Sequence, residues 1–304
     1  MNDNIDTINK IMISSFATIA FASLIVLYYT FGKTVTNSLL YMPYKATMNE
    51  FNDLSKEFKR NEEFVNFKSN DNLDLTGMLI NYRKKADWND IIFLYSHGNA
   101  SWIGHFFNSH AITILSHFGS VFVYDYRAYG LNQGNLSEEG TYMDVLGAWN
   151  FLTKVKNVPP NKIIIYGHSM GGAVSTKLMS ILVENNQIKN KKISEDELPR
   201  GMILNGTFSN LADMGNCMFI GLGYLAYYKY DNVQNLKLIE KYLCKDNIQF
   251  PILIVHSKDD EIIPFEQSIK LKNACSSYHI KTTGSHNVPV FDKYVIDFII
   301  YLTK

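Results

Sequence analysis

The sequence predicts an α/β fold in which helices flank a mostly parallel sheet. Strand-length apolar runs alternate with helical patterns over most of the 304 residues, as expected of βαβ units with right-handed crossovers. Two earlier runs of alternating apolar and polar residues, joined by a turn-rich stretch at 69–72, predict a β-hairpin. The predicted strands are 64–67, 73–80, 91–96, 120–125, 162–166, 201–205, 251–256 and 277–281.

One of these strands ends in a pentapeptide with the pattern G-x-S-x-G. Gly167 to Gly171 directly follows the apolar run 162–166, which would place Ser169 on a sharp turn between a strand and a helix. Such a turn exposes the serine hydroxyl, and the helix that begins near Met170 offers backbone N–H groups to a developing oxyanion. Because so short a pattern also arises by chance, the rest of the chain has to decide its meaning.

A nucleophilic serine needs a base and an acid, and candidates for both follow it. An imidazole takes the serine proton and later returns it to the leaving group, while a carboxylate holds the imidazole in the right tautomer. Asp260 lies in the loop after strand 251–256, at a carboxyl end where catalytic groups collect. His286 lies in a loop of small residues before the last helical segment. The order Ser169, Asp260, His286 is the one that a nucleophile elbow predicts.

Other carboxylates compete for the acid role. Asp259 and Glu261 flank Asp260, although a solvated loop is the simpler interpretation of both. Asp213 follows the preceding predicted strand, from which some hydrolases draw their acid. Asp260 is preferred among the four, and His286 is preferred as the base among eight histidines.

Stabilising the oxyanion requires a second N–H group besides that of Met170, and a loop after an early strand supplies it in enzymes with this kind of turn. Asn99 follows strand 91–96 and Gly98, which would permit a tight bend. Taken alone, the segment would be an ordinary Gly-Asn turn. Its place ahead of the serine, acid and histidine in the chain predicts that Asn99 is the second donor.

Further segments extend this pattern. They are Ser96–Ala100 (SHGNA), Ile103–His105 (IGH), Val123–Gly130 (VYDYRAYG), Ser137–Gly140 (SEEG), Gly167–Gly172 (GHSMGG), Asp260–Pro264 (DEIIP) and His286-Asn287. As a series they resemble the α/β-hydrolase family. More narrowly, they resemble the membrane-anchored group that includes alpha/beta hydrolase domain-containing protein 13 and its bud-emergence relatives in fungi. The resemblance covers roughly residues 35–303.

The resemblance implies an α/β-hydrolase fold with the triad Ser169, Asp260 and His286, and with Asn99 and Met170 as oxyanion donors. Related members include protein depalmitoylases as well as monoacylglycerol and phospholipid hydrolases. The resemblance thus implies an enzyme that acts on ester or thioester bonds.

The chain departs from the family pattern at three positions. Ala128 stands where a glycine is usual in the segment D-Y-R-G-Y-G, and Asn132 stands where a serine is common. Ser257 replaces the glycine of H-G-x-x-D. None of these changes removes a catalytic group. Ala128 and Ser257 predict small backbone shifts.

Composition argues against several classes of function. The formal net charge is zero and like charges form no block, so nucleic acid is not an expected partner. The three cysteines, Cys217, Cys244 and Cys275, are widely spaced and odd in number, which predicts neither a disulfide framework nor a metal site. No cofactor is expected. The length and the 46% hydrophobic content suit one large α/β domain with an appendage.

The appendage is an apolar segment near the N-terminus. Residues 11–31 carry no charge and would form a helix about 31 Å long, enough to cross a hydrocarbon core of roughly 30 Å. Because this run exceeds the usual apolar core of a signal peptide, about 7–15 residues, an uncleaved anchor is favoured over a signal peptide. Tyr28 and Tyr29 suit the membrane interface. The predicted organisation is an N-terminal segment, 1–33, and a hydrolase domain, 34–304.

The chain between the strands 201–205 and 251–256 is longer than a simple crossover requires. The stretch 207–250 is predicted as an insertion, and much of it is apolar and aromatic. It is either a crossover helix packed on the sheet or a small cap that lines an acyl-binding groove. In the second case, charged substitutions at Phe219 or Leu222 would impair long-chain substrates more than acetyl esters.

The predicted function is that of a membrane-anchored serine hydrolase. It would cleave carboxylic esters or thioesters through an acyl-serine intermediate, on a lipid or acylated-protein substrate, because the anchor would lie beside an apolar cap. Two alternatives stay open. One is a protein depalmitoylase, and the other is a catalytically silent hydrolase-fold scaffold, against which the intact serine, acid and histidine argue.

Overall fold

The computed structural model describes residues 2–57, 62–80, 91–188, 192–218 and 220–304. The strands are β1 (Glu62–Lys68), β2 (Asp74–Ile80), β3 (Ile92–Ser96), β4 (Ser120–Tyr124), β5 (Ile163–His168), β6 (Gly201–Asn205), β7 (Ile252–Ser257) and β8 (Tyr278–Thr282). They form one sheet in the spatial order β1-β2-β4-β3-β5-β6-β7-β8. β2 pairs antiparallel with β1 and β4, and the other neighbours pair parallel. The predicted α/β fold is confirmed, strand by strand.

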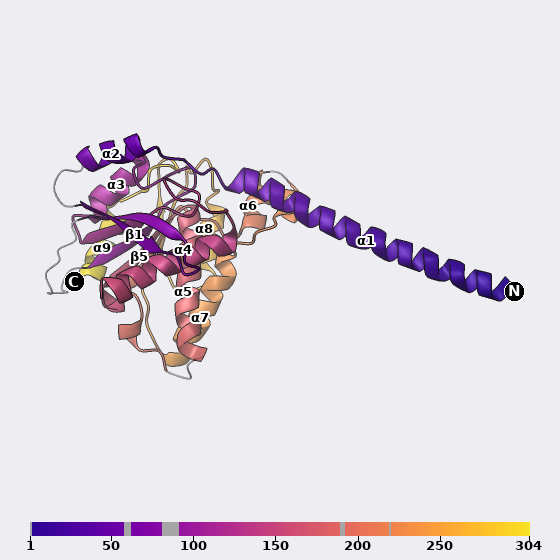
Figure 1. Cartoon of the computed structure of the whole chain (residues 1–304). Helices are drawn as coiled ribbons and strands as arrows, with labels where there is room; N and C mark the ends of the chain where they lie inside the picture. The colour runs from indigo at the N-terminus through magenta and orange to yellow at the C-terminus, as the bar shows by residue number, and fades with distance from the viewer. Residues whose placement is uncertain (1, 58–61, 81–90, 189–191, 219) are drawn as a thin grey trace.

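Helices cover both faces of this sheet (Figure 1). They are α1 (Asn2–Leu40), α2 (Met48–Glu57), α3 (Phe106–Leu115), α4 (Glu138–Asn150), α5 (Met170–Ile188), α6 (Leu211–Met218), α7 (Asn232–Asp246), α8 (Glu266–Lys272) and α9 (Lys293–Thr303). Side chains of α4, α5, α7 and α8 share one core with Leu94 of β3, while α3 and α9 share the other core with its neighbour Tyr95. Because successive residues of a strand point to opposite faces and both faces are covered, each central strand is buried throughout and mostly apolar.

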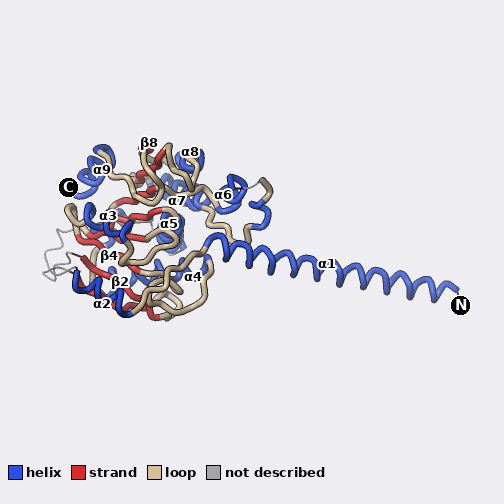
Figure 2. Tube along the Cα trace, turned by 90° about the horizontal axis from the view of Figure 1, so that it is seen from above, coloured by secondary structure: helices blue, strands red, loops and turns tan. Residues whose placement is uncertain are grey.

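α1 projects from the domain as a single rod (Figures 1 and 2). Its stretch Thr18–Ser38 is long and apolar enough to cross a membrane and is almost wholly exposed, alone in this among the described helices. The predicted span, 11–31, overlaps this stretch but begins and ends earlier. The helix also runs unbroken through the predicted boundary between 1–33 and 34–304, because no proline lies within it to end it.

The predicted insertion 207–250 divides into two parts. α6 and the short 3₁₀ helix η4 (Leu222–Leu225) lie beside the C-terminal end of α1 (Figures 1 and 2). α7 packs along α5 and contributes to the larger core. The crossover interpretation therefore describes α7, and the cap interpretation concerns only the segment from α6 to η4. Phe219 lies outside the described residues.

Ala128, the first departure from the family pattern, has a φ of +64°, in the left-handed region that favours glycine. Its N–H still donates to the carbonyl of Gln133 at 3.0 Å, so the turn keeps its hydrogen bond. The alanine is therefore accommodated at the cost of local backbone strain. An L side chain in this region costs about 1–2 kcal/mol, part of which the greater unfolded-state freedom of glycine offsets.

We expect Ala128→Gly to raise the free energy of unfolding by about 0.5–1 kcal/mol, because the strain is removed. Denaturant unfolding of the purified protein measures this change. The matched control is Ala173→Gly within α5, where the same replacement should lower the free energy of unfolding by about 1 kcal/mol or more. A loss of stability in both variants would show that the turn at Ala128 is not strained.

Candidate active site

Ser169 lies on the turn between β5 and α5, with a φ of +54° that is unusual for a residue other than glycine. Its backbone is held on both sides, because its N–H donates to the carbonyl of Asn205 at 3.0 Å and its carbonyl accepts from the hydroxyl of Thr207 at 2.7 Å. α5 approaches β3 so closely that a Cβ at Gly171 would lie 1.9 Å from the carbonyl oxygen of Ser96. The G-x-S-x-G pattern therefore forms the strained turn that the sequence predicts.

A continuous chain of hydrogen bonds joins Ser169, His286 and Asp260. The hydroxyl of Ser169 lies 2.9 Å from Nε2 of His286, and Nδ1 of His286 lies 2.8 Å from Oδ2 of Asp260. The other oxygen of Asp260 accepts from the backbone N–H groups of Ile262 and Ile263, at 3.0 and 2.7 Å. Burial alone would raise the pKa of Asp260, but the hydrogen bond and charge of His286 and these N–H groups hold that pKa below its usual value. The carboxylate is charged and orients the imidazole.

The competing carboxylates lie elsewhere. Asp213 accepts from Lys270 at 2.7 Å and from the hydroxyl of Ser209 at 2.8 Å, as part of the contact between α6 and α8. Asp259 points its side chain into solvent. Of the four candidates, Asp260 alone contacts the ring of His286.

Two residues that the sequence did not predict as supports of His286 hold it by its backbone. Glu261 accepts from the N–H of His286 at 3.1 Å and from the hydroxyl of Ser285 at 2.6 Å, so it does more than the solvated loop residue expected from the sequence. Nε2 of His168 donates to the carbonyl of His286 at 3.0 Å. Burial and, after it, the nearby His286 lower the pKa of His168 to about 3, which keeps that ring neutral. In the sequence, the only signals for these residues were the position of Glu261 next to Asp260 and that of His168 next to Ser169.

Ser257, the replacement in the H-G-x-x-D segment, connects the loop that carries Asp260 (the acid loop) to the loop that carries His286 (the histidine loop). Its hydroxyl donates to the carbonyl of Gly284 at 2.6 Å and accepts from the N–H of Asp259 at 3.0 Å. A glycine could make neither bond. The departure that predicted a backbone shift therefore supplies a cross-link between the two loops that carry Asp260 and His286.

The contact between Glu261 and His286 yields a testable effect on turnover. We expect Glu261→Ala to lower kcat about five- to tenfold with little change in KM, because the histidine loop loses two hydrogen bonds to a charged group while the substrate cavity is untouched. Steady-state kinetics with a soluble ester measure this. Asp259→Ala removes a neighbouring exposed carboxylate and should leave kcat unchanged. Equal losses in both variants would indicate a general effect of charge in the loop.

Asn99 and Met170 both border the cavity described below. The N–H of Met170 is the first of α5, and the first N–H groups of a helix have no partner within it. The side chain of Asn99 is engaged elsewhere: its oxygen accepts from the N–H of Met42 at 2.9 Å and from the hydroxyl of Tyr129 at 2.7 Å, and its nitrogen donates to the carbonyl of Leu40. Any role in binding an oxyanion thus belongs to the backbone N–H of Asn99.

A cavity of about 280 Å³ borders Ser169 and His286. Its walls come from the end of α1, from the segment α6 to η4 and from the acid loop. The apolar members are Val35, Leu40, Met42, Ala100, Met170, Phe208, Leu211, Met214, Leu222, Ala226, Ile262 and Ile263. A mostly apolar cavity with a few polar groups at one place is the usual form of a site for a small apolar ligand.

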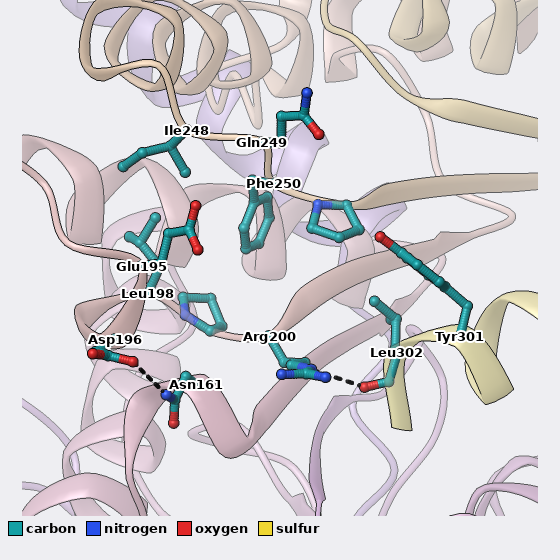
Figure 3. A pocket seen from close by; sticks show the side chains of 12 residues that line it. Asn161, Glu195, Asp196, Leu198, Arg200, Ile248, Gln249, Phe250, Tyr301 and Leu302 are labelled. Carbon is teal, nitrogen blue, oxygen red and sulfur yellow. Dashed lines mark hydrogen bonds between the residues drawn. The ribbon is translucent and has the colours of Figure 1, made fainter. Parts of the chain in front are cut away.

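A second cavity, of about 290 Å³, lies at the opposite ends of β6 and β7 (Figure 3). There Asn161 donates to Asp196 at 2.7 Å, and Arg200 donates to the carbonyl of Leu302 at 3.0 Å. Arg200 and Phe250 precede their strands, whereas ligands of open α/β sheets bind at the carboxyl ends. Its described walls hold no serine, cysteine or histidine, so they contain no pair like that of Ser169 and His286.

Within the part of the chain that the structure describes, no three or more His, Cys, Asp or Glu side chains are arranged to hold a metal ion. The three cysteines are free, and Cys217 and Cys244 are exposed. The polar residues that border the first cavity are Thr36, Asn99, Ser169, His286 and Asn287.

Known proteins match this chain over most of its length. A family profile described as serine hydrolase (FSH1) matches residues 126–298. Uncharacterized protein R595 of Acanthamoeba polyphaga mimivirus is 31% identical over 85% of this chain and 89% of its own length. Protein bem46 of Schizosaccharomyces pombe is 27% identical over 76% of this chain and 73% of its own. Lysophosphatidylserine lipase ABHD12 of Danio rerio is 26% identical over 68% of this chain, which spans only 52% of that relative.

Solved structures show the same fold. The esterase Pf2001 of Pyrococcus furiosus superposes with a TM-score of 0.58 at 14% identity, over 87% of this chain and 97% of the esterase. An alpha-beta hydrolase from Vibrio vulnificus superposes with a TM-score of 0.59 at 20% identity, over 81% of this chain and 91% of that protein. At such identities the likeness concerns the fold alone.

Proposed function

Because this chain belongs to the FSH1 family of serine hydrolases, we propose that it cleaves ester bonds with Ser169 as nucleophile and His286 as base. Asp260 orients the base. The observation that carries this assignment is the hydrogen-bonded chain from Ser169 through His286 to Asp260, with separations of 2.9 and 2.8 Å. Its position at the wall of an apolar cavity gives the same residues access to a substrate.

The proposed reaction has two halves. His286 takes the proton of Ser169 as the serine oxygen attacks the ester carbon, and the carbonyl π electrons move onto the carbonyl oxygen. The N–H groups of Met170 and Asn99 stabilise that oxyanion. When the intermediate collapses, the bond to the leaving oxygen breaks and His286 protonates the alcohol. Water then attacks the acyl-serine by the same route and releases the carboxylic acid.

We further propose that the substrate is a lipid or a lipid-modified molecule. The walls of the cavity are mainly aliphatic side chains, which suit an acyl chain better than a polar group. The name of the relative lysophosphatidylserine lipase ABHD12 points to the same class of substrate. A protein depalmitoylase is the second candidate, since the same cavity would receive an acyl chain that is linked through sulfur.

α1 is the proposed membrane anchor. Its stretch Thr18–Ser38 has the length and hydropathy of a single span, and little of it is buried. If α1 spans the bilayer, the protein stays in the membrane pellet after carbonate extraction. Release into the supernatant would reject the anchor.

The cap segment supports a prediction about chain length. Leu222 borders the cavity, and a carboxylate there would have to be desolvated beside an acyl chain. We expect Leu222→Glu to lower kcat/KM for a dodecanoyl ester about tenfold or more and to leave an acetyl ester nearly unchanged, as measured with nitrophenyl esters. Ile188→Glu, at the exposed end of α5, is the control. An equal loss for both esters would remove the acyl-groove interpretation.

A reconstituted assay tests the proposed function. The full-length protein in liposomes is offered a lysophospholipid, a monoacylglycerol and an S-palmitoylated peptide, with Ser169→Ala as the control for each. Hydrolysis of the lipids by the parent protein alone is the expected result, and preference for the peptide would favour the depalmitoylase. Failure of a folded protein to cleave any of the three would contradict the proposed substrate class.

A further inference from the structure

The end of α1 and the cap segment form one packed unit. The hydroxyl of Tyr28 donates to the backbone carbonyl of Tyr224, and the ring of Tyr29 meets that of Tyr227 edge-on at 6.2 Å. The backbone N–H of Tyr227 donates to the hydroxyl of Thr36 at 3.0 Å. These contacts extend over more than two turns of the helix, so they fix the position of the cap along the axis of α1.

That level falls inside the proposed membrane span. The stretch Thr18–Ser38 has 21 residues, about 31 Å of helix, and every α1 residue in these contacts belongs to it. Lys33 lies over the ring of Tyr227 at 5.8 Å, and a lysine near the end of a span places its charge among the lipid head groups. Tyr28 lies five residues earlier, about 7.5 Å further toward the bilayer centre. Tyr224, bonded to Tyr28, is therefore at the depth of the acyl chains.

The cap is apolar on its outer side at this level. Tyr224 is 80% exposed and Ile220 is 94% exposed, and Tyr227 is partly exposed between them and α1. Met42 and Ile262, on the rim of the cavity, are also exposed. Exposed large apolar side chains beside a membrane span are typical of a protein surface that inserts into the membrane.

The cavity opens against the same helix. Val35 and Thr36, in the last turns of the proposed span, are wall residues of the cavity that contains Ser169. The end of α1 therefore belongs both to the proposed membrane span and to the wall of the cavity, and the cap forms another part of that wall.

We propose that the exposed apolar side chains of the cap, Ile220 and Tyr224, are immersed in the lipid leaflet beside α1, and that the acyl chain of the substrate passes directly from that leaflet into the cavity. This inference rests on the proposed function, because it states where the substrate of Ser169 enters. The occupant of the exposed apolar surface is the lipid bilayer, since that surface is continuous with the span.

Depth-dependent quenching tests the immersion without reference to activity. Tyr224→Cys is labelled with a polarity-sensitive fluorophore in a full-length chain with its three cysteines replaced by serine, and reconstituted in phosphatidylcholine liposomes. Tyr294→Cys, on α9 and 68% exposed, is the matched control. Nitroxide lipids labelled near the head group should quench the label at position 224 and leave the label at 294 unquenched. Equal quenching at the two positions, or none at 224, would overturn the proposal.

Kinetics test the entry of substrate. Tyr224→Glu should lower hydrolysis of a long-chain lysophospholipid presented in liposomes about tenfold, because a charge at this depth opposes immersion. Tyr294→Glu should not. A soluble acetyl ester separates the two claims: if the parent fails to cleave it, the proposed function is wrong whatever the quenching shows. If Tyr224→Glu keeps full activity on liposomes and cleaves the acetyl ester normally, the proposed entry from the leaflet is wrong and the proposed function stands.

Discussion

Replacing Ser169 by alanine is expected to reduce kcat for ester hydrolysis by at least about 10⁴-fold, since no other group in the cavity can form the acyl-enzyme. The hydroxyl of Ser169 lies 2.9 Å from Nε2 of His286, and its removal leaves the base without a proton to take. Initial rates with a soluble nitrophenyl ester measure the loss. A residual rate above the uncatalysed reaction is expected, because the oxyanion donors remain.

Ser175, six residues further along the chain in α5, gives the matched control for this variant. It is also buried, and its hydroxyl has no hydrogen-bond partner among the described residues. Ser175→Ala should keep the activity of the parent protein and its thermal stability. If Ser175→Ala lost as much activity as Ser169→Ala, the loss would reflect damage to α5 and not the removal of a nucleophile.

Asp260→Asn is expected to lower kcat about 10⁴-fold while leaving the fold intact. An asparagine has the same shape, but it presents a neutral amide to His286 and does not stabilise the imidazolium that forms during attack. The carboxylate accepts three hydrogen bonds, from His286, Ile262 and Ile263, and its pKa is held below the usual value by these contacts against the effect of burial. Stopped-time assays at neutral pH measure the change in kcat.

The other carboxylates near this site give the controls. Asp213→Asn removes the partner of Lys270 and Ser209 and should affect stability more than turnover. Asp259→Asn alters an exposed side chain and should affect neither. A loss of activity in Asp213→Asn as large as that in Asp260→Asn would return the acid role to the loop after β6.

The arrangement of the sheet was predictable because parallel strands leave strong local signals. Each central strand is mostly apolar, and each ends in a loop whose place at the carboxyl edge follows from the pairing alone. Ser169 and Asp260 follow the central strands β5 and β7, and His286 follows the edge strand β8, so the topology brings all three to one edge. Chain order and residue type were sufficient for these three.

The contacts that support the site were not predictable in the same way. Glu261 and His168 act through the backbone of His286, and their partners are set by how two loops meet in space, which no local pattern records. The packing of α1 on the cap is also a contact between distant segments. Its effect on the site, through Val35 and Leu40 in the cavity wall, follows from tertiary structure only. Hydropathy located the helix, and the predicted span 11–31 overlaps its apolar stretch Thr18–Ser38.

Mapping the covalent adduct of a fluorophosphonate tests the central claim most directly. Such a probe reacts with a serine that a neighbouring base has activated, and mass spectrometry of the digested protein identifies the modified residue. We predict a single adduct on the peptide that carries Ser169, absent from the Ser169→Ala variant and strongly slowed in Asp260→Asn. An adduct on another residue, or none on a folded protein in its membrane, would contradict the assignment of Ser169 as the nucleophile.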